Sequence, residues 1–242
     1  MGGNVFQDAE PFEHEKIPDI MKQINNVLSK IGVKALPIGS GATPTPGKVS
    51  GDLDMIVDAD ALANHFKSPD IKTVRKELRS LFDQAGLQTG ASGVSVHVRA
   101  PVGDKAHQVD IMVVPKAEIA QQFHIHDIPK GSPYKGVHKQ VLLSKLAKMQ
   151  NLLWSAYEGL WTRGPDGKKN QFYTDDLDKI AQTLLGKGAT GKDLGSVETI
   201  FAKLPQSVVD QIQQEVADDP IWQKSLQKES AELARIKELS GL

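Results

Sequence analysis

The chain has 242 residues and a formal net charge of −1, so no strong overall attraction to nucleic acid or acidic membranes is expected. It contains no cysteine, which excludes disulfides, zinc–thiolate sites and cysteine nucleophiles. No apolar run reaches the roughly 18 residues that a membrane span needs, and the N-terminal "MGGNVFQDAEPF" has no apolar signal core. We therefore expect a cytoplasmic protein with no membrane partner.

The first half of the chain predicts a mixture of strands and helices. Residues 1–12 are expected to form a loose arm. From Ile17 to Ile31 apolar residues recur with helical spacing, and Gly32 is a natural helix end. Apolar patterns also predict strands at 33–40, 52–58, 94–102 and 107–115 and a helix at 70–86. The last two strands are expected to form a β-hairpin.

The second half, beginning near Pro133, predicts helices alone. One long helix is predicted over 137–161 from a stripe made of Leu142, Leu146, Met149, Leu153, Ala156 and Leu160. Further helices are predicted at 175–186, 193–204 and 206–219, before a charged tail. The predicted class is therefore α+β, with a small mixed sheet flanked by helices in 1–135 and an α-helical domain in 136–242.

A Gly-rich stretch before the second strand contains Gly47-Lys48, which invites comparison with a P-loop. A P-loop needs glycine where Ala42 stands and a hydroxyl residue where Val49 stands, and a helix follows it. A strand is predicted here instead, and two prolines in the stretch remove backbone N–H donors. These mismatches argue against a P-loop.

Two acidic residues, Asp52 and Asp54, begin the strand that follows this loop. Their side chains point to the same face because strand side chains alternate. Neighbouring carboxylates repel each other unless a cation lies between them, and Mg²⁺ or Mn²⁺ prefers such oxygen ligands. The alternative is a solvated strand start with turn-forming acids.

A third acidic residue, Asp110, lies within the apolar strand 107–115. Such a strand is expected to be buried on both faces, and an unpaired carboxylate there would be strongly unfavourable. Asp110 therefore needs a partner. The candidates are a shared metal ion and a salt bridge, for example to Arg99 or His97.

In combination, these residues resemble the DNA polymerase β nucleotidyltransferase superfamily. That family has Gly-Ser at the end of one strand, Asp-x-Asp on the next strand and a third acid on a later strand. The corresponding residues here are Gly39-Ser40, Asp52-Leu53-Asp54 and Asp110. The resemblance covers about 1–115. The stretch "SPYKGVHKQVLLSKLA" also resembles the long helix that follows the catalytic domain, and the chain is similar to nucleotidyltransferases encoded by phages.

The resemblance implies an enzyme that uses Mg²⁺ or Mn²⁺ to transfer an NMP from an NTP to an acceptor hydroxyl, with release of pyrophosphate. The implied catalytic and metal-binding residues are Asp52, Asp54 and Asp110. The implied nucleotide-binding residues are Gly39, Ser40, Lys48, Ser50, Lys135, His138 and Lys139. One departure is that many members have Ser directly before Asp-x-Asp, whereas here Gly51 intervenes.

The acceptor is expected to be an RNA or DNA 3′ end, because segment 135–174 has an excess of Lys and Arg that suits a phosphate backbone. Exposed Lys is also ordinary on a helix surface. The alternatives are transfer to a small molecule or a protein, and a non-catalytic nucleotide-binding or virion-associated role.

Two further groups of residues have candidate roles. His124 and His126 are expected on one face of a strand, where they suggest a metal site but lack a third ligand. The aromatic residues Trp154, Tyr157 and Trp161 occur at helical spacing and are interpreted as packing residues.

Overall fold

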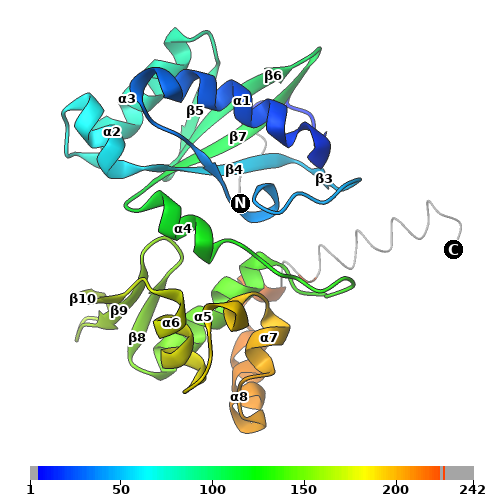
Figure 1. Cartoon of the computed structure of the whole chain (residues 1–242), viewed down its shortest axis with the longest axis vertical. Helices are drawn as coiled ribbons and strands as arrows, with labels where there is room; N and C mark the ends of the chain where they lie inside the picture. The colour runs from blue at the N-terminus through cyan, green and yellow to red at the C-terminus, as the bar shows by residue number, and fades with distance from the viewer. Residues whose placement is uncertain (1–4, 224–225, 227–242) are drawn as a thin grey trace, which may run out of the picture. The chain divides into compact units, whose positions relative to one another are not determined.

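The computed structural model describes residues 5–223 and 226, and its contacts divide the chain into two compact units, Met1–Ile125 and His126–Leu242 (Figure 1). Helices and strands occur in both units, and the C-terminal region is mainly helical, which confirms the α+β class. No helix in the described residues is long and apolar enough to cross a membrane. The predicted charged tail lies largely outside the described residues.

The division falls after Ile125, earlier than the predicted boundary at residue 135. Hydrogen bonds explain the difference, because they tie the intervening segment to the second unit. The backbone N–H of Asp127 donates to the carbonyl of Gly195 at 3.0 Å. The hydroxyl of Ser132 donates to the carboxylate of Glu198. These are long-range contacts that local sequence patterns do not reveal.

The first unit is built on a five-stranded mixed sheet in the order β2-β4-β7-β6-β5 (Figure 1). Its strands are β2 (Leu36–Pro37), β4 (Asp52–Asp58), β5 (Thr89–Ser92), β6 (Ser95–Val102) and β7 (Lys105–Val114). Strands β4 and β7 run parallel, whereas the other neighbouring pairs are antiparallel. The predicted β6–β7 hairpin is confirmed. Strand β5 is an addition, because its short sequence TGAS carries little apolar alternation.

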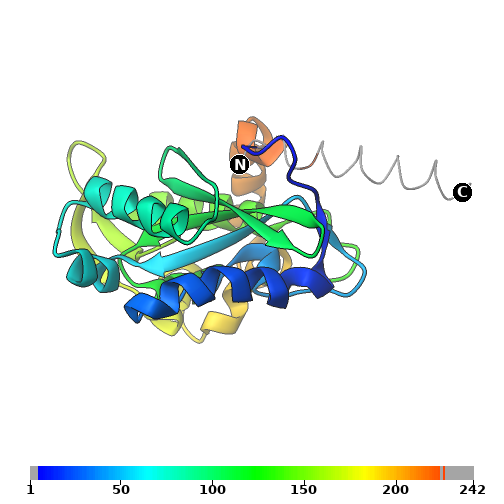
Figure 2. The ribbon, with the colours of Figure 1, turned by 90° about the horizontal axis from the view of Figure 1, so that it is seen from above.

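Helices α1 (Ile17–Leu28) and α3 (Ile71–Gln84) form where helical spacing predicts them, and they pack against the sheet (Figure 2). A short helix, α2 (Ala59–Phe66), is an addition to the predicted elements. Its start is stabilised by Asp58, whose side chain accepts a hydrogen bond from the N–H of Ala61. Another short helix, α4 (Ala117–Phe123), packs against β2 and β4.

Alternation along the strands gives the two faces of the sheet different chemistry. The core beneath α1 and α3 includes Leu53, Met55 and Val57 of β4. Asp52 and Asp54 therefore project from the opposite face of the same strand. By the same rule, β7 sends Val109 and Ile111 into this core and Gln108 and Asp110 to the acidic face. The sheet thus separates an apolar core from a row of carboxylates.

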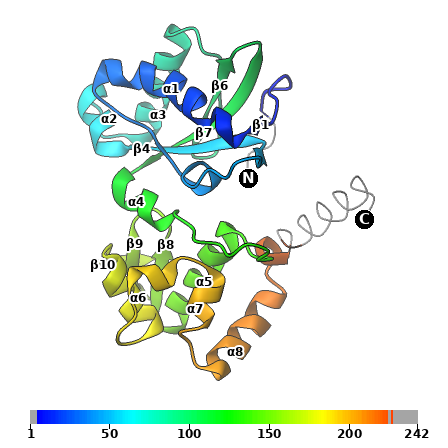
Figure 3. The same cartoon turned by 45° about the vertical axis from the view of Figure 1, so that its right-hand side comes forward.

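The expectation of a loose arm at residues 1–12 is wrong for its described part. Phe6 and Phe12 are buried in the first unit. Strand β1 (Phe12–Glu13) pairs with β3 (Val49–Ser50), just before the start of β4 (Figure 3). Burial of two phenylalanine rings stabilises this packing by removing apolar surface from water. The arm therefore helps to shape the loop that precedes the acidic strand.

The predicted long helix over 137–161 is wrong beyond residue 149. Helix α5 (Gly136–Met149) is followed by a three-stranded antiparallel sheet made of β8 (Leu152–Ser155), β9 (Gly159–Arg163) and β10 (Lys169–Thr174). Of the predicted helical stripe, Leu142, Leu146 and Met149 do lie on α5, whereas Leu153 and Leu160 lie on neighbouring strands. Leu153 pairs with Trp161, and Trp154 pairs with Leu160. Asn151, with φ of 56°, turns the chain between α5 and β8.

The rest of the second unit is helical, as predicted, with α6 (Leu177–Leu185), α7 (Val197–Phe201) and α8 (Gln206–Ala217). The helix predicted over 193–204 divides in two, however. A 3₁₀ helix, η4 (Gly191–Leu194), ends before Gly195, and α7 starts anew.

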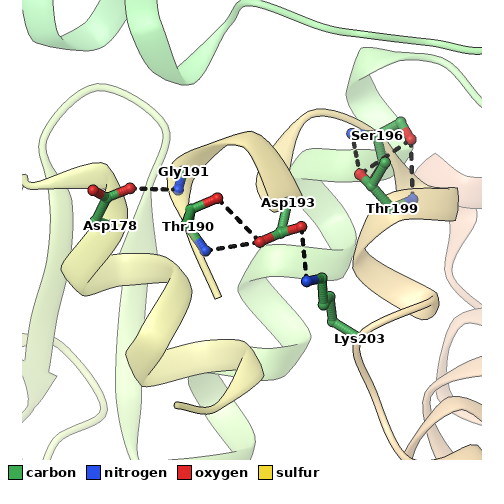
Figure 4. Close-up of polar contacts among 7 residues, drawn as sticks. All are labelled: Asp178, Thr190, Gly191, Asp193, Ser196, Thr199 and Lys203. Atoms are coloured by element: carbon green, nitrogen blue, oxygen red, sulfur yellow. Dashed lines mark hydrogen bonds and ion pairs between the residues drawn. The ribbon is translucent and has the colours of Figure 1, made fainter. Parts of the chain in front are cut away.

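Side-chain caps account for this division (Figure 4). The carboxylate of Asp193 accepts hydrogen bonds from the backbone N–H and the hydroxyl of Thr190, which begins η4. Directly after Gly195, the Ser196 hydroxyl accepts from the N–H of Thr199 and begins α7. Two successive N-caps favour two short elements over one continuous helix.

Candidate active site

The acidic face of the first unit places Asp54 directly beside Asp110 on the parallel pair β4–β7. Asp52 lies one step along the same face, opposite Gln108. The next strand, β6, adds His97 opposite Asp110 and Arg99 opposite Gln108. The polar residues predicted from separate segments therefore come together in a short row across three strands.

Asp110 is buried, and its protein partners are His97 and Gln108. The Nδ1–H of His97 donates to Oδ1 of Asp110 at 2.6 Å, and Nε2 of Gln108 donates to the same oxygen at 2.9 Å. The other ring nitrogen of His97, Nε2, lies 2.7 Å from Oγ of Ser92. The sequence left two alternatives for Asp110, a metal ion or a salt bridge to Arg99 or His97. The structure shows the pair with His97.

Arg99, the other candidate partner, is engaged elsewhere. Its guanidinium binds the carboxylate of Asp8 at 2.6 and 3.0 Å. The guanidinium of Arg99 therefore does not pair with the carboxylates of the acidic row. The side-chain hydrogen bonds that hold Asp110 both end on Oδ1 in the described residues.

Electrostatic repulsion is concentrated at β4. Burial raises the pKa of Asp54 to about 7, and the charges of Asp52 and Asp110 act in the same direction. Burial and the charge of Asp110 likewise raise the pKa of Asp52. Although many atoms surround Asp54, the residue is exposed, so its carboxylate is accessible to water. A cation arriving from solvent would relieve the repulsion.

The Gly-Ser loop lies against the same strand. Its 3₁₀ turn, η3 (Gly39–Gly41), follows Ile38, whose N–H donates to the carbonyl of Asp54 at 3.0 Å. Gly41 packs so closely that a Cβ there would lie 2.5 Å from Cδ1 of Leu53. Ser40 is exposed, and its Oγ lies 3.2 Å from Oγ of Ser50. The loop thus holds two hydroxyls next to the acidic strand.

The end of this loop is anchored by residues that sequence patterns do not single out. His14 and Glu15 lie in the 3₁₀ turn η1 (His14–Lys16) that precedes α1, and they accept hydrogen bonds from the backbone N–H groups of Thr45 and Gly47. Lys48 is exposed, and its carbonyl accepts from the N–H of His14. A strand follows the loop, so the mismatch with a P-loop extends to the structure.

The remaining predicted nucleotide ligands, Lys135, His138 and Lys139, belong to the second unit. Both ring nitrogens of His138 are engaged, since Nδ1 accepts from the N–H of Lys135 at 2.7 Å and Nε2 lies 3.2 Å from the carbonyl of Trp222. This buried ring caps helix α5 and packs edge-to-face against Trp222. We therefore leave His138 out of the proposed site.

Lys139 is also buried, and burial lowers the pKa of its ammonium group to about 8. Lys135 is half-buried at the start of α5. Within segment 135–174, Lys168 and Lys169 form ion pairs with Asp166 and Glu158.

The predicted histidine pair does not lie on a strand. His124 is the C-cap residue that follows helix α4, and His126 lies in a segment without regular structure. Within the described ranges, no three His, Cys, Asp or Glu side chains form a ready-made metal site. His124 and His126 are therefore not part of such a site. The carboxylates of the acidic row lie on one face of the sheet but are not gathered around a single point.

The aromatic residues of the second unit contribute to packing. Trp154 donates its indole N–H to the side-chain oxygen of Gln140 at 2.7 Å, which links β8 to α5. Trp161 packs edge-to-face on Phe172 of the neighbouring strand. These contacts agree with the packing role, although the residues lie on strands and not on a helix.

The sequence matches no family model and no curated protein. The resemblance to polymerase β-like nucleotidyltransferases therefore rests on the motif residues and on their placement in the first unit.

Proposed function

We propose that the first unit is the catalytic part of a nucleotidyltransferase that uses an NTP and Mg²⁺ or Mn²⁺. The observation that carries this proposal is the register of β4 and β7, which pairs Asp54 with Asp110 and puts Asp52 on the same face. The adjacent loop adds the exposed hydroxyl of Ser40. A row of carboxylates beside such a loop suits a phosphate chain that binds together with a divalent cation.

In the proposed reaction, the oxygen of an acceptor hydroxyl attacks the α-phosphorus of the NTP. A new P–O bond forms to the acceptor, and the bond from the α-phosphorus to the oxygen bridging the β-phosphate breaks. Pyrophosphate leaves with that oxygen and its bonding electrons, and the hydroxyl proton passes to solvent or to a carboxylate. Such a transfer depends mainly on positioning and on charge neutralisation.

The donor set fits Mg²⁺ or Mn²⁺ in its chemistry, because Asp52, Asp54 and Asp110 supply only hard oxygen atoms. When bound, the ion would neutralise negative charge on the phosphates and on the acceptor oxygen. Burial is the larger cause of the raised pKa values of Asp52 and Asp54, and repulsion among the carboxylates adds to it. A bound cation would offset the part that comes from repulsion. The side chains of Asp52 and Asp54 would have to rotate towards Asp110.

The residues around the carboxylates have separate tasks in this proposal. His97 and Gln108 hold Asp110 by one oxygen, which fixes the plane of its carboxylate. Ser40 donates a hydrogen bond to phosphate. The positive φ of Gly39, 57°, gives the loop a turn that residues with a side chain rarely adopt.

The acceptor that we propose is a nucleic-acid 3′ hydroxyl. This choice is supported by the Lys and Arg excess of segment 135–174. Within that segment, Lys148 lines an open cavity of about 450 Å³ in the second unit, together with Lys145, Met149, Gln211 and Glu215. Labelling with an NTP that carries ³²P at the α-phosphate, in the presence of Mg²⁺ and a mixture of tRNA, primed DNA and protein, would identify the acceptor.

The variants Asp54→Asn and Asp110→Asn test the assignment. Each should reduce label transfer by about 100-fold or more, because each removes a charged ligand. Asp104→Asn is the matched control, since Asp104 is exposed in the turn of the β6–β7 hairpin, and it should transfer normally. Full activity in Asp110→Asn, or no labelled acceptor with wild-type protein, would contradict the proposal.

A further inference from the structure

The loop before the acidic strand is held by a histidine from the N-terminal segment. His14 is only 2% exposed. Its backbone N–H donates to the carbonyl of Lys48 at 2.9 Å. Its ring nitrogens Nδ1 and Nε2 lie 2.9 Å from the N–H of Thr45 and 2.8 Å from Oγ of Ser50. One residue thus contacts the loop at three points along its length.

These contacts fix the tautomer of the ring. A backbone N–H can only donate, so Nδ1 of His14 must accept from Thr45 and carries no proton. The ring proton is then on Nε2, which donates to Oγ of Ser50. Burial and the charge of Lys48 lower the pKa of His14, while Glu15 acts in the opposite direction, and the net effect favours this neutral ring.

The hydroxyls of Ser50 and Ser40 can continue this chain of hydrogen bonds. Because Ser50 accepts from His14, its own proton is available for Ser40, whose Oγ lies 3.2 Å away. When Ser50 donates to Ser40, Ser40 keeps its own proton for a group outside the loop. Ser40 is exposed and lies beside β4. The chain of hydrogen bonds therefore ends in a donor that faces solvent near Asp54.

We propose that His14 is a positioning residue that orients Ser50 and Ser40, so that Ser40 donates to a phosphate of the bound nucleotide. This inference rests on the proposed nucleotidyltransferase function. It assigns a role to the N-terminal segment, which contacts the loop through both His14 and the β1–β3 pair. It also explains why a buried histidine stands where simple packing would favour an apolar side chain.

Two substitutions of His14 test the contacts of its two ring nitrogens separately. His14→Asn keeps an acceptor near the position of Nδ1 and removes the donor to Ser50. His14→Gln brings an amide N–H close to the position of Nε2 and restores that donor. Binding of inorganic triphosphate and of ATP, each with Mg²⁺, can be measured by calorimetry for both variants, for Ser50→Ala and for the double variant His14→Asn/Ser50→Ala.

We expect His14→Asn and Ser50→Ala each to weaken binding about tenfold, the effect of one hydrogen bond to a charged group. The double variant should be no weaker than either single variant, because both remove the same connection. His14→Gln should retain affinity within about threefold. His65→Asn, an exposed site on α2, is the matched control and should bind normally.

The outcomes distinguish this inference from the function on which it rests. If the wild-type protein binds neither triphosphate nor ATP, the proposed function fails and the role of His14 fails with it. If the wild type binds but the effects of His14→Asn and Ser50→Ala add, only the positioning role is overturned. Should His14→Asn fail to fold, the exposed Ser40 allows a second test of the same chain of hydrogen bonds. Ser50→Ala should weaken binding no further in a Ser40→Ala background, and an additive loss would overturn the positioning role.

Discussion

Asp54 and Asp110 are directly paired on adjacent parallel strands, although α2, α3, β5 and β6 lie between them in the sequence. The pairing brings two carboxylates together on the polar face of a sheet whose other face is the apolar core. Like charges in adjacent positions destabilise a sheet. Their presence therefore has an energetic consequence that can be measured in the absence of any ligand.

We predict that Asp54 makes the metal-free protein less stable as pH rises. Its pKa is about 7 in the folded chain, against 3.8 when unperturbed. Between these values the unfolded chain has released the proton and the folded chain still holds it, so the free energy of unfolding falls with rising pH. Asp54→Asn should remove this loss. Because Asp54 is exposed, we expect a stabilisation of only about 1 kcal/mol at pH 8.

Thermal melts in EDTA at pH 5 and pH 8 would check this prediction. Asp54→Asn should melt about 2–4 °C above the wild type at pH 8, and the difference should shrink at pH 5. Millimolar Mg²⁺ should raise the melting temperature of the wild type at pH 8 more than that of the variant. An unchanged difference between the two pH values would show that Asp54 is not the responsible group.

A second prediction concerns His97, which donates to the buried carboxylate of Asp110. His97→Ala removes this donor and leaves the carboxylate with Gln108, so it should reduce the free energy of unfolding by about 2–4 kcal/mol. Arg99→Ala should have a much smaller effect, because its partner Asp8 is exposed. Urea unfolding of both variants makes the comparison. A larger loss for Arg99→Ala would contradict the assignment of partners.

The location of the site follows from local sequence, whereas its connections do not. Alternation along β4 predicts that Asp52 and Asp54 share a face, and the apolar surroundings of Asp110 predict its burial. The contact of His14 with Ser50 has no such signal, because it joins the N-terminal segment to a loop with no shared periodicity. Helical spacing also fails where aromatic and branched residues fit a hairpin equally well, as in β8 and β9.

A third prediction compares two glycines of the loop region. Gly41→Ala would place a Cβ 2.5 Å from Cδ1 of Leu53, a buried side chain, and should cost about 1–3 kcal/mol. Gly51→Ala meets nothing within 4 Å, which makes it the matched control, and it should be nearly neutral. Chemical denaturation checks stability, and ATP binding checks whether the loop is displaced. Equal behaviour of the two variants would mean that the loop does not pack against Leu53.

The last prediction tests whether the chain leaves the helix after Met149, as the structure describes. Asn151 has φ of 56°, a conformation that glycine adopts without strain and alanine resists by about 1 kcal/mol. Asn151→Gly should therefore leave the stability unchanged or raise it, and Asn151→Ala should lower it. In a continuous helix over 137–161 the order would reverse, because alanine is the best helix former and glycine among the worst. Thermal melts of the two variants thus decide between the hairpin and the helix by the sign of their difference.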